Sequence, residues 1–480
     1  MGRTLLPDPP DPHESAPPTP RPGIAGIGTD VTTAAPDPSA GEPGGAEGTK
    51  ASTDQSYRPR SFGKITGFDG LRGVGVLIIF VAHIEVILPI ETLLVVPGAA
   101  VPLDLFFVLS GFLITALLLR EQGRFGKIGT GAFYRRRVLR LLPALYVVVL
   151  ANALFAYFTH QWAHTETESI LSVLFYFSNF FSASAAGPLT PKLASGFQHM
   201  WSLAFEEQFY FIWPWVTIAL LTIRLRLRTV VIVILILILA VGVHRAILWE
   251  EAPRWWSYLY RTDTRADSIL WGALLAHIWM RHKEPTRWFP VAGWIAAAFL
   301  VFVLIFTNEF GPFLYLGGFD AIDIACAVLL LAVLDGRWGG RHLFELKPLV
   351  AMGVVSYAFY LWHLPVFFAV RYFDTHWNDV VRVVVAFGTT LALTLLSWFA
   401  MEKPLMRWSK RLEDKRRTTL ETAAPAAGQG AGPTGPSPAQ PLQTPDDPPR
   451  SSAPDTASRS PAPETTPTST NVDAAGPPDP

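Results

Sequence analysis

An apolar run in the first quarter of this sequence contains two ionisable residues eleven positions apart, Arg72 and His83. Eleven residues of α-helix return to nearly the same face and rise roughly 16 Å, at ~1.5 Å per residue. If the run is a membrane helix, both side chains therefore lie on one stripe of it. Ionisable groups inside a span are costly and usually face a protein interior or a water-filled path. The spacing predicts a functional pair.

Further arginines stand where another apolar run begins. Arg137 and Arg140 lie one helical turn apart, and Arg135 and Arg136 directly precede them. Guanidinium groups form paired hydrogen bonds with phosphate oxygens, so Arg72, Arg137 and Arg140 at one mouth of a bundle would suit a phosphorylated ligand. The alternative is that this cluster only sets the orientation in the membrane. We favour that alternative for Arg135 and Arg136, and both interpretations stay open for Arg137 and Arg140.

Carboxylates and a second histidine occur in other apolar runs. Glu206 and Glu207 are adjacent, and two neighbouring carboxylates cannot both face lipid. Ser356, Tyr360 and His363 share one helical face in a later run. An imidazole near a carboxylate is a reasonable general base toward a hydroxyl, because the imidazole pKa lies close to neutral pH. The residues predicted to be catalytic are His83, Glu206, Glu207 and His363.

Other polar residues near the starts of apolar runs have two interpretations. Asp104 begins the second run, and Arg265 and Asp267 begin a later one. A buried ion pair between Arg265 and Asp267 would be structural, whereas the same groups in a polar path would bind substrate. With these alternatives open, substrate contacts are predicted for Asp104, Trp201, Ser202, Arg265, Asp267 and Tyr360.

The composition places the chain among membrane proteins. Half of its 480 residues are hydrophobic and 16% are charged, with equal numbers of acidic and basic side chains, so it has no basic footprint for nucleic acid. A single cysteine, Cys326, excludes an intrachain disulfide and a thiolate metal cluster. We find no HExxH, GxSxG or P-loop pattern, so zinc protease, serine hydrolase and nucleotide hydrolase find no support, and no metal site is predicted.

The apolar runs divide the chain into three parts. Residues 1–61 and 413–480 are rich in Pro, Gly, Ala, Ser and Thr and are predicted to be disordered tails. Residues 62–412 are predicted to form an all-α transmembrane bundle. The first tail lacks the short apolar core of a cleaved signal peptide, so the first span is expected to be retained. Ten spans are predicted, at about 68–90, 99–119, 141–158, 200–221, 229–249, 264–280, 290–308, 313–334, 349–370 and 380–401.

An eleventh candidate, residues 169–185, is shorter and interrupted by serines and an asparagine. We expect an interfacial or re-entrant segment there. With ten spans and a cytoplasmic N-terminus, the cytoplasmic loops hold 23 Lys and Arg and the opposite loops hold four. This asymmetry predicts that both tails are cytoplasmic. It also puts Arg72 near the cytoplasm and His83 in the outer half.

The ordered motifs resemble the acyltransferase-3 family of bacterial integral-membrane acyltransferases, which modify sugars, lipopolysaccharide, peptidoglycan and macrolides. The likeness covers residues 62–410, and the ordered set is far more specific than any one motif. Leu103 departs from the pattern, because the family often has Gly or Val there. We find no Gly-Asp-Ser element or strand pattern after the last span, so no fused hydrolase-like domain is expected. The matching motifs are Asp69-Gly-Leu-Arg72 with His83, Asp104–Ile114, Arg137-Val-Leu-Arg140, Trp201–Tyr210, Arg265–Ser268, Ser356–Pro365 and Glu402-Lys-Pro404.

The resemblance implies a multi-pass enzyme of the bacterial plasma membrane. It implies a cytoplasmic acyl-CoA donor, with acetyl-CoA as the default, and a hydroxyl acceptor on a cell-envelope glycan, a lipid or an exported small molecule. It also implies functional importance for Arg72, His83, Arg137 and Arg140. Our hypothesis is that the arginines hold the CoA phosphates while His83, oriented by Glu206 or Glu207, accepts the proton of the hydroxyl.

The rival hypothesis is a transporter or flippase for a glycolipid, which would use the same buried charges as a substrate or proton path. No inverted repeat is evident in the spans. Consumption of acyl-CoA by the purified protein would separate the two hypotheses.

Overall fold

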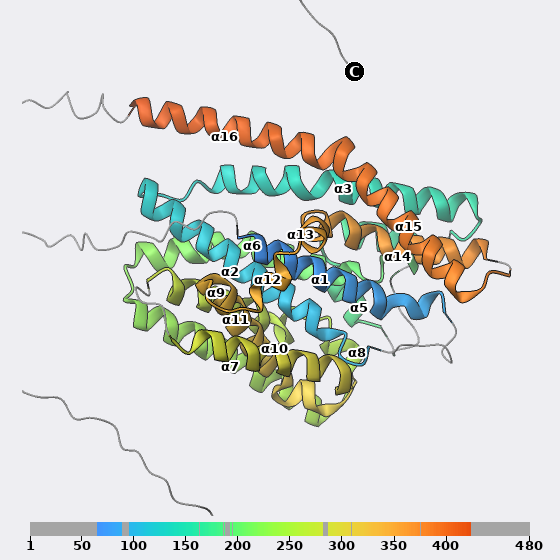
Figure 1. Cartoon of the computed structure of the whole chain (residues 1–480), viewed down its shortest axis with the longest axis horizontal. Coiled ribbons are helices and arrows are strands. Elements are labelled where there is room, and N and C mark those ends of the chain that lie inside the picture. Colours follow the sequence, from blue (N-terminus) through green and yellow to red (C-terminus); the bar gives the residue numbers. More distant parts are fainter. Residues whose placement is uncertain are drawn as a thin grey trace, which may run out of the picture.

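The computed structural model describes residues 65–88, 96–162, 164–185, 187, 193, 195–281, 287–308, 310–374 and 376–423. These residues form helices and no strand, in agreement with the predicted all-α class (Figure 1). The predicted N-terminal tail lies outside the described residues. Residues 413–423 of the predicted C-terminal tail continue a helix instead, and the rest of that tail, from residue 424, lies outside the described residues. The first eleven helices are α1 Thr66–Ala82, η1 His83–Val86, α2 Ala100–Phe125, α3 Thr130–Phe158, α4 His164–Leu174, α5 Ser178–Ala183, η3 Ser195–Phe197, α6 Met200–Thr222, α7 Leu227–Glu251, α8 Trp255–Tyr258 and η4 Thr262–Thr264. The remaining ten are α9 Ala266–Trp279, α10 Phe289–Phe306, η5 Leu314–Gly318, α11 Phe319–Asp335, α12 Arg341–Phe344, α13 Lys347–Val354, α14 Ser356–Phe373, α15 Asp379–Ser397, η6 Trp398–Glu402 and α16 Lys403–Ala423.

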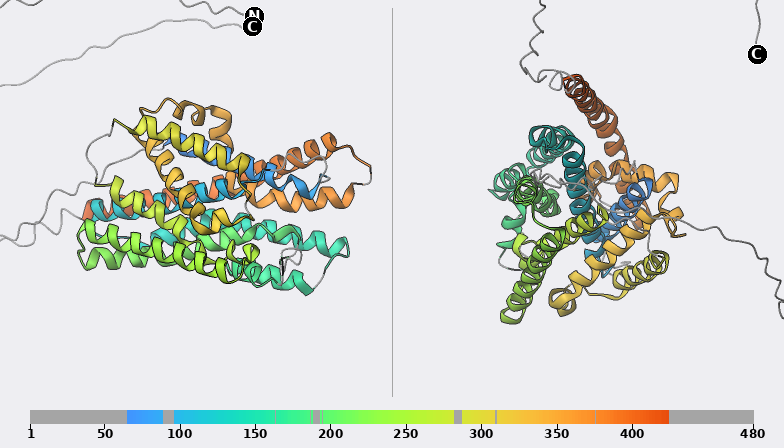
Figure 2. Two further views of the ribbon diagram at one scale, coloured as in Figure 1. Left: turned by 90° about the horizontal axis from the view of Figure 1, so that it is seen from below. Right: turned by 90° about the vertical axis from the view of Figure 1, so that its left-hand side faces the viewer.

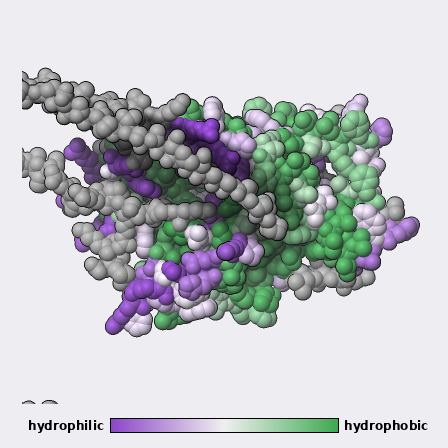
Figure 3. Space-filling model, turned by 45° about the horizontal axis from the view of Figure 1, so that its top comes forward, coloured by the Kyte–Doolittle hydropathy of each residue, from purple (hydrophilic) through white to green (hydrophobic). Residues whose placement is uncertain are grey.

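Seven helical segments in the described part of the chain are long and apolar enough to cross a membrane. The pair α13 and α14, bent by 74°, makes an eighth if it is one span. Two of the ten predicted spans fall on helices of another kind: α9 has 14 residues, and α6 carries Glu206, Glu207 and Gln208 among its apolar residues. An apolar surface covers the middle of the face in Figure 3, with hydrophilic residues gathered mainly toward one end. The seven segments are Thr66–Val86, Ala100–Phe125, Thr130–Phe158, Leu227–Glu251, Phe289–Phe306, Leu314–Asp335 and Asp379–Leu412.

Helix α2 is the central helix of the bundle. Most residues of α2 are buried, whereas few residues of α7 and α10 are. Helices α7 and α10 lie at the edge of the bundle (Figure 2). Helix α2 packs closely on α9, since Gly111 and Gly272 leave room for the two backbones to meet. A Cβ on Gly111 would lie 2.0 Å from the carbonyl oxygen of Ile269. Close packing of this kind fixes the rotation of α2 and therefore the direction of its side chains.

Helix α1 is held in the same way against α13. A Cβ on Gly73 would lie 2.1 Å from the carbonyl oxygen of Leu349, and one on Gly353 would lie 1.5 Å from that of Asp69. No residue larger than glycine fits at these contacts without moving a backbone. The glycine face of α1 therefore points to α13 and leaves Arg72 to face the interior of the bundle.

The segment predicted to be re-entrant or interfacial forms two short helices, α4 and α5, which contact α3 and α6. The chain is not helical between them, at residues 175–177. Tyr176 has a φ of 57°, which is uncommon for a residue other than glycine. Its carbonyl oxygen accepts a hydrogen bond from Nε2 of Gln208 at 2.8 Å. The break therefore lies beside the carboxylate pair of α6.

Candidate active site

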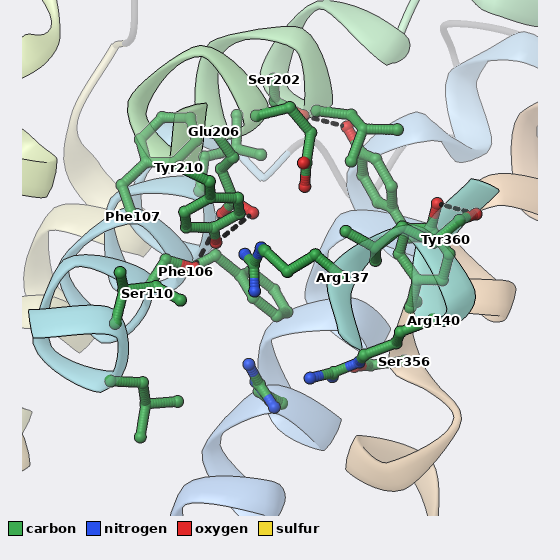
Figure 4. Close-up of a pocket in the computed structure, with 18 of the residues that line it drawn as sticks. Phe106, Phe107, Ser110, Arg137, Arg140, Ser202, Glu206, Tyr210, Ser356 and Tyr360 are labelled. Carbon is green, nitrogen blue, oxygen red and sulfur yellow. Dashed lines mark hydrogen bonds between the residues drawn. The ribbon is translucent and has the colours of Figure 1, made fainter. Parts of the chain in front are cut away.

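A cavity of about 320 Å³ lies between α1, α2, α3, α6 and α14. Four arginines, two glutamates and six hydroxyl side chains line it, together with aliphatic and phenylalanine side chains (Figure 4). The first and last residues of its lining, Arg72 and Tyr360, are almost 290 positions apart in the sequence. We call this space the arginine cavity, after Arg72, Arg120, Arg137 and Arg140.

Two of these arginines form no ion pair within the described residues, although Glu207 and Glu402 lie within electrostatic range of Arg140. Within the described residues, neither Arg72 nor Arg140 makes a hydrogen bond or an ion pair. Arg140 also lies within electrostatic range of both Arg72 and Arg137, whose like charges repel it. An anion that enters the cavity would relieve this repulsion and satisfy free N–H groups.

Arg137 is held differently. Its guanidinium lies 3.2 Å from the centre of the Tyr210 ring, in a cation–π contact. The hydroxyl of Tyr210 donates to Oε2 of Glu206 at 2.9 Å, and Oγ of Ser110 donates to Oε1 of the same carboxylate at 3.1 Å. Glu206 is thus satisfied at both oxygens, and Tyr210 connects it to the arginine. In Figure 4, Arg137 points into the space between Glu206 and Arg140.

Glu207 is the less satisfied carboxylate of the pair. Its Oε1 is buried and has no hydrogen-bond partner in the described part of the chain. The side chain lines the arginine cavity and also a second cavity on the other side of α6. A buried carboxylate oxygen without a donor is costly, so a ligand with a hydroxyl or amide group would find an acceptor there.

Three imidazoles gather beyond one end of the arginine cavity. The ring centres of His83 and His363 are 5.2 Å apart, and those of His199 and His363 are 4.8 Å apart. Tyr360, which lines the cavity, connects the two places: its hydroxyl donates to the carbonyl oxygen of His199 at 2.6 Å and lies 2.6 Å from Oγ of Ser202. We call His83, His199 and His363 the histidine cluster.

The ring of His83 is oriented by the backbone. Nδ1 lies 2.9 Å from the carbonyl oxygen of Ile79, and since a carbonyl can only accept, this nitrogen carries the proton. Nε2 is then left with a free lone pair. Nδ1 of His363 is bound in the same way to the carbonyl oxygen of Tyr360, and its Nε2 is buried without a partner among the described residues. His83 is only partly buried, so it is the accessible member of the two.

The predicted orientation of His83 by Glu206 or Glu207 is wrong. Glu206 binds Ser110 and Tyr210, and within the described residues neither glutamate forms a hydrogen bond with a histidine. The physical reason is depth: the carboxylates stand beside the arginines, whereas the imidazoles lie beyond Tyr360.

The stripe predicted on the first helix has its two ends in different surroundings. Arg72 and Ile79 line the arginine cavity, and His83 follows Ile79 by one turn, where the α-helix gives way to η1. His83 and His363 themselves are not part of the cavity lining. Ile79 and Tyr360 therefore form one end of the cavity, and the imidazoles lie just beyond that end.

The predicted substrate-binding residues separate into two groups. Ser202 and Tyr360 line the arginine cavity. Trp201 packs against Phe107 and Tyr260 instead. The remaining three, Asp104, Arg265 and Asp267, lie in a closed network of charges outside the cavity.

In that network the arginines pair with partners that were not predicted. Arg265 pairs with Asp104 rather than with Asp267. Asp267 pairs with Arg245, whose other amino group binds Asp320 at 2.8 Å. The possible pair of Arg265 with Asp267 is thus replaced by two pairs with other helices. We call these five residues the ion-pair cluster.

Several residues of this region had no role predicted from the sequence. Tyr210 carried a usable signal, because it follows Glu206 by four positions and so shares its helical face. His199 and Arg245 carried none, because their neighbours come from helices far away in the sequence. Within the described residues, no three His, Cys, Asp or Glu side chains are arranged to hold a metal ion.

Comparisons with known proteins agree on one family. A family model described as an acyltransferase domain matches residues 65–400. YrhL of Bacillus subtilis (strain 168), provisionally named a peptidoglycan O-acetyltransferase, is 32% identical over 365 residues, which cover 71% of this chain and 55% of YrhL. The peptidoglycan O-acetyltransferase OatA of Listeria monocytogenes is 28% identical, over 72% of this chain and 56% of its own. For the O-acetyltransferase OatA of Staphylococcus aureus (strain NCTC 8325), the identity is 27% and the two shares are 74% and 58%.

The chain spans just over half the length of these relatives. No solved structure matches it.

Proposed function

Because the chain belongs to the acyltransferase family, whose model covers residues 65–400, we propose that it is a membrane O-acyltransferase. It moves an acyl group, acetyl by default, from acyl-CoA to a hydroxyl of a cell-envelope glycan, glycolipid or exported metabolite. The names of the relatives support an acetyl group and a glycan acceptor. The observation that carries the proposal is a cavity with unpaired arginines inside it and imidazoles just beyond its end.

The arginines provide the donor site. Arg72 and Arg140 have free guanidinium groups, and Arg137 presents a third that Tyr210 holds in place. Coenzyme A carries phosphate groups at one end and its thioester at the other. With the phosphates on the arginines, the pantetheine arm extends along the cavity toward Tyr360, and the thioester approaches the histidine cluster.

The imidazoles provide the base. As the acceptor oxygen attacks the thioester carbon, Nε2 of His83 accepts the hydroxyl proton, the C–O bond forms and the C–S bond breaks. The CoA thiolate leaves and takes up the proton. The Ile79 carbonyl holds His83 in the tautomer this requires, His363 packs against the ring of His83, and His199 packs against His363. Ser202 and Tyr360, at the junction, contact the substrate.

The ion-pair cluster and Trp201 have a supporting role in this proposal. Asp104, Arg265 and Asp267 are buried, form ion pairs between helices and do not line the arginine cavity, so they are not placed to bind a ligand there. They hold α2, α7, α9 and α11 in register. Glu206 likewise acts through Tyr210 on Arg137, and Glu207 is the carboxylate available to substrate.

The excess of Lys and Arg in the loops at one end supports a bacterial plasma membrane orientation with both tails in the cytoplasm. Arg72 and Arg140 then lie toward the side where acyl-CoA is available. The acceptor is reached from the opposite side or from the bilayer.

Purified protein in lipid nanodiscs tests the proposal. We expect release of free CoA thiol from acetyl-CoA that depends on an added glycan, and a gain of one acetyl mass on that glycan by mass spectrometry. Glycolipid movement between leaflets without acetyl-CoA consumption would instead indicate a flippase.

A further inference from the structure

A second cavity, of about 410 Å³, lies against α3, α6 and the break between α4 and α5. We call it the side cavity. Polar groups form a much smaller part of its wall than of the wall of the arginine cavity. The apolar side chains that belong to it alone are Val138, Leu142, Phe175, Phe177, Phe211 and Ile212.

The side cavity opens toward the surroundings of the bundle rather than toward its interior. Val138 is 48% exposed, Phe177 58% and Phe211 68%. These residues lie on a protein whose helices present large apolar side chains outward, which is the surface that contacts lipid. A hydrocarbon chain could therefore enter the side cavity without leaving the bilayer.

The two cavities share one wall. Arg137, Leu141, Glu207 and Tyr210 line both. Arg137 is held on Tyr210, but Glu207 has a buried oxygen with no partner in the described residues. That oxygen accepts hydrogen bonds and repels anions, so it suits an incoming hydroxyl and opposes a phosphate.

The remaining side of the side cavity is formed by the non-helical backbone between α4 and α5, which hydrogen bonds hold in place. Gln208 donates to the Tyr176 carbonyl at 2.8 Å and to Oδ1 of Asn179 at 2.9 Å, and its own Oε1 accepts from Thr262 at 2.8 Å. Non-helical backbone within a membrane bundle is tolerated where it is buried in protein or lines a cavity. These bonds keep Tyr176 at its positive φ, so the side cavity is held open by the fold.

We propose that the side cavity binds the hydrocarbon chain of a lipid-linked acceptor, whose sugar enters the arginine cavity sideways from the bilayer, binds Glu207 through one hydroxyl and presents its reacting hydroxyl toward Tyr360 and His83. This inference rests on the proposed function and deepens it, because it names a glycolipid as the acceptor class. The charges favour the acceptor over acyl-CoA in the side cavity. The phosphates of acyl-CoA fit Arg72 and Arg140 in the arginine cavity, whereas a neutral sugar hydroxyl fits the free carboxylate oxygen of Glu207.

Two glycosides that differ only in their chain test the proposal: dodecyl and methyl N-acetylglucosaminide. Each is offered with acetyl-CoA to protein in nanodiscs of phosphatidylethanolamine and phosphatidylglycerol. Val138→Trp and Ile212→Trp fill the side cavity from exposed positions. Leu150→Trp, also on α3 and 58% exposed but outside both cavities, is the matched control.

We expect both filling variants to raise the KM for the dodecyl glycoside about tenfold, which corresponds to about 1.4 kcal/mol. The KM for the methyl glycoside and for acetyl-CoA should stay within about twofold, and Leu150→Trp should resemble wild type. Equal effects of filling on both glycosides would overturn the proposal. So would an effect confined to octanoyl-CoA against acetyl-CoA, because the side cavity would then hold the donor's chain.

A photoreactive diazirine on the dodecyl chain supplies a readout that does not need turnover. Labelling should fall on peptides that contain residues 134–142, 175–177 and 208–212, and excess unlabelled dodecyl glycoside should compete with it. Labelling elsewhere overturns the proposal even if acyl transfer is normal. Labelling at these peptides without acetyl-CoA consumption by any variant would instead refute the proposed function, and with it the acceptor role of the bound glycoside.

Discussion

The arginine cavity and the ion-pair cluster use the same residue types on two sides of α2, but their arginines differ in burial and in ion pairing. In the ion-pair cluster, the side chains of Arg245 and Arg265 are fully buried; Arg245 pairs with two carboxylates and Arg265 with one. In the arginine cavity, Arg72 and Arg140 face open space and have no hydrogen-bond partner among the described residues.

The presence or absence of ion pairs distinguishes arginines that stabilise the bundle from arginines that are available to bind a ligand. A buried charge costs several kcal/mol unless a partner compensates it, so a paired network is self-sufficient. Guanidinium groups that line a cavity without an ion pair gain hydrogen bonds and closer charge compensation when an anion binds. An intramembrane arginine is thus informative about function only once its partners are known.

The largest effect should come from the histidine cluster. His83→Ala removes the proposed base, and acyl transfer should fall by about 10²–10⁴-fold, because general bases contribute on that order. Release of CoA thiol measures it, and gel filtration checks that the variant stays folded. His342→Ala, at a position whose side chain is 71% exposed, is the control. Normal turnover in His83→Ala would refute the base assignment.

A comparable loss, but of stability, should follow from breaking the ion-pair cluster. Asp104→Leu leaves Arg265 buried without its partner, which should cost about 3–5 kcal/mol of unfolding free energy. The double variant Asp104→Leu with Arg265→Met removes both charges and should recover most of that loss. Thermal unfolding in detergent measures both. If the double variant were as unstable as the single one, the pair would not be the source of the effect.

The arginine cavity should show the opposite pattern. Arg140→Ala should change unfolding free energy by less than about 0.5 kcal/mol, since no ion pair is lost. Its Kd for acetyl-CoA should rise about 10- to 100-fold, as expected for one charged hydrogen-bonding group. Isothermal titration measures the affinity, with the exposed Arg226→Ala as control. An unaltered Kd would count against the donor site.

The smallest effect should occur beside the ion-pair cluster, at the surface. Burial alone would raise the pKa of Asp263, but hydrogen bonds with Arg261 and His244 outweigh burial and lower it. A lowered folded pKa adds stability above the unfolded value of about 3.9, and this is lost as the pH falls through the folded pKa. Its side chain is 46% exposed, so the gain should stay below about 1 kcal/mol.

Asp263→Asn removes this titration. Between about pH 5 and pH 3, its unfolding temperature should fall slightly less steeply than that of wild type. A difference as large as that of Asp104→Leu would show that exposure does not weaken this pair.

Much of the fold was predictable because helical periodicity is a local property. The apolar runs located the helices, and the short, polar-interrupted run at 169–185 coincides with two short helices. The predicted count of ten spans is approximate: seven or eight of the described helical segments meet a criterion of length and hydropathy, because α9 is short and α6 carries two carboxylates. A helix packed among other helices can be short or carry charged residues, so length and hydropathy alone do not fix the number of spans.

What the sequence determined by itself is which side chains share a helix face: Arg72 with Ile79 and His83, Arg137 with Arg140, and Tyr360 with His363. What only the tertiary structure decided is which faces meet. Arg265 pairs with a carboxylate 161 positions away, and His363 lies beside His199 from another helix. Close backbone contacts at glycines, such as Gly353 against Asp69, fix which helix faces pack together. Periodicity depends on the backbone of one helix, whereas pairing depends on how close two backbones come, which no single segment specifies.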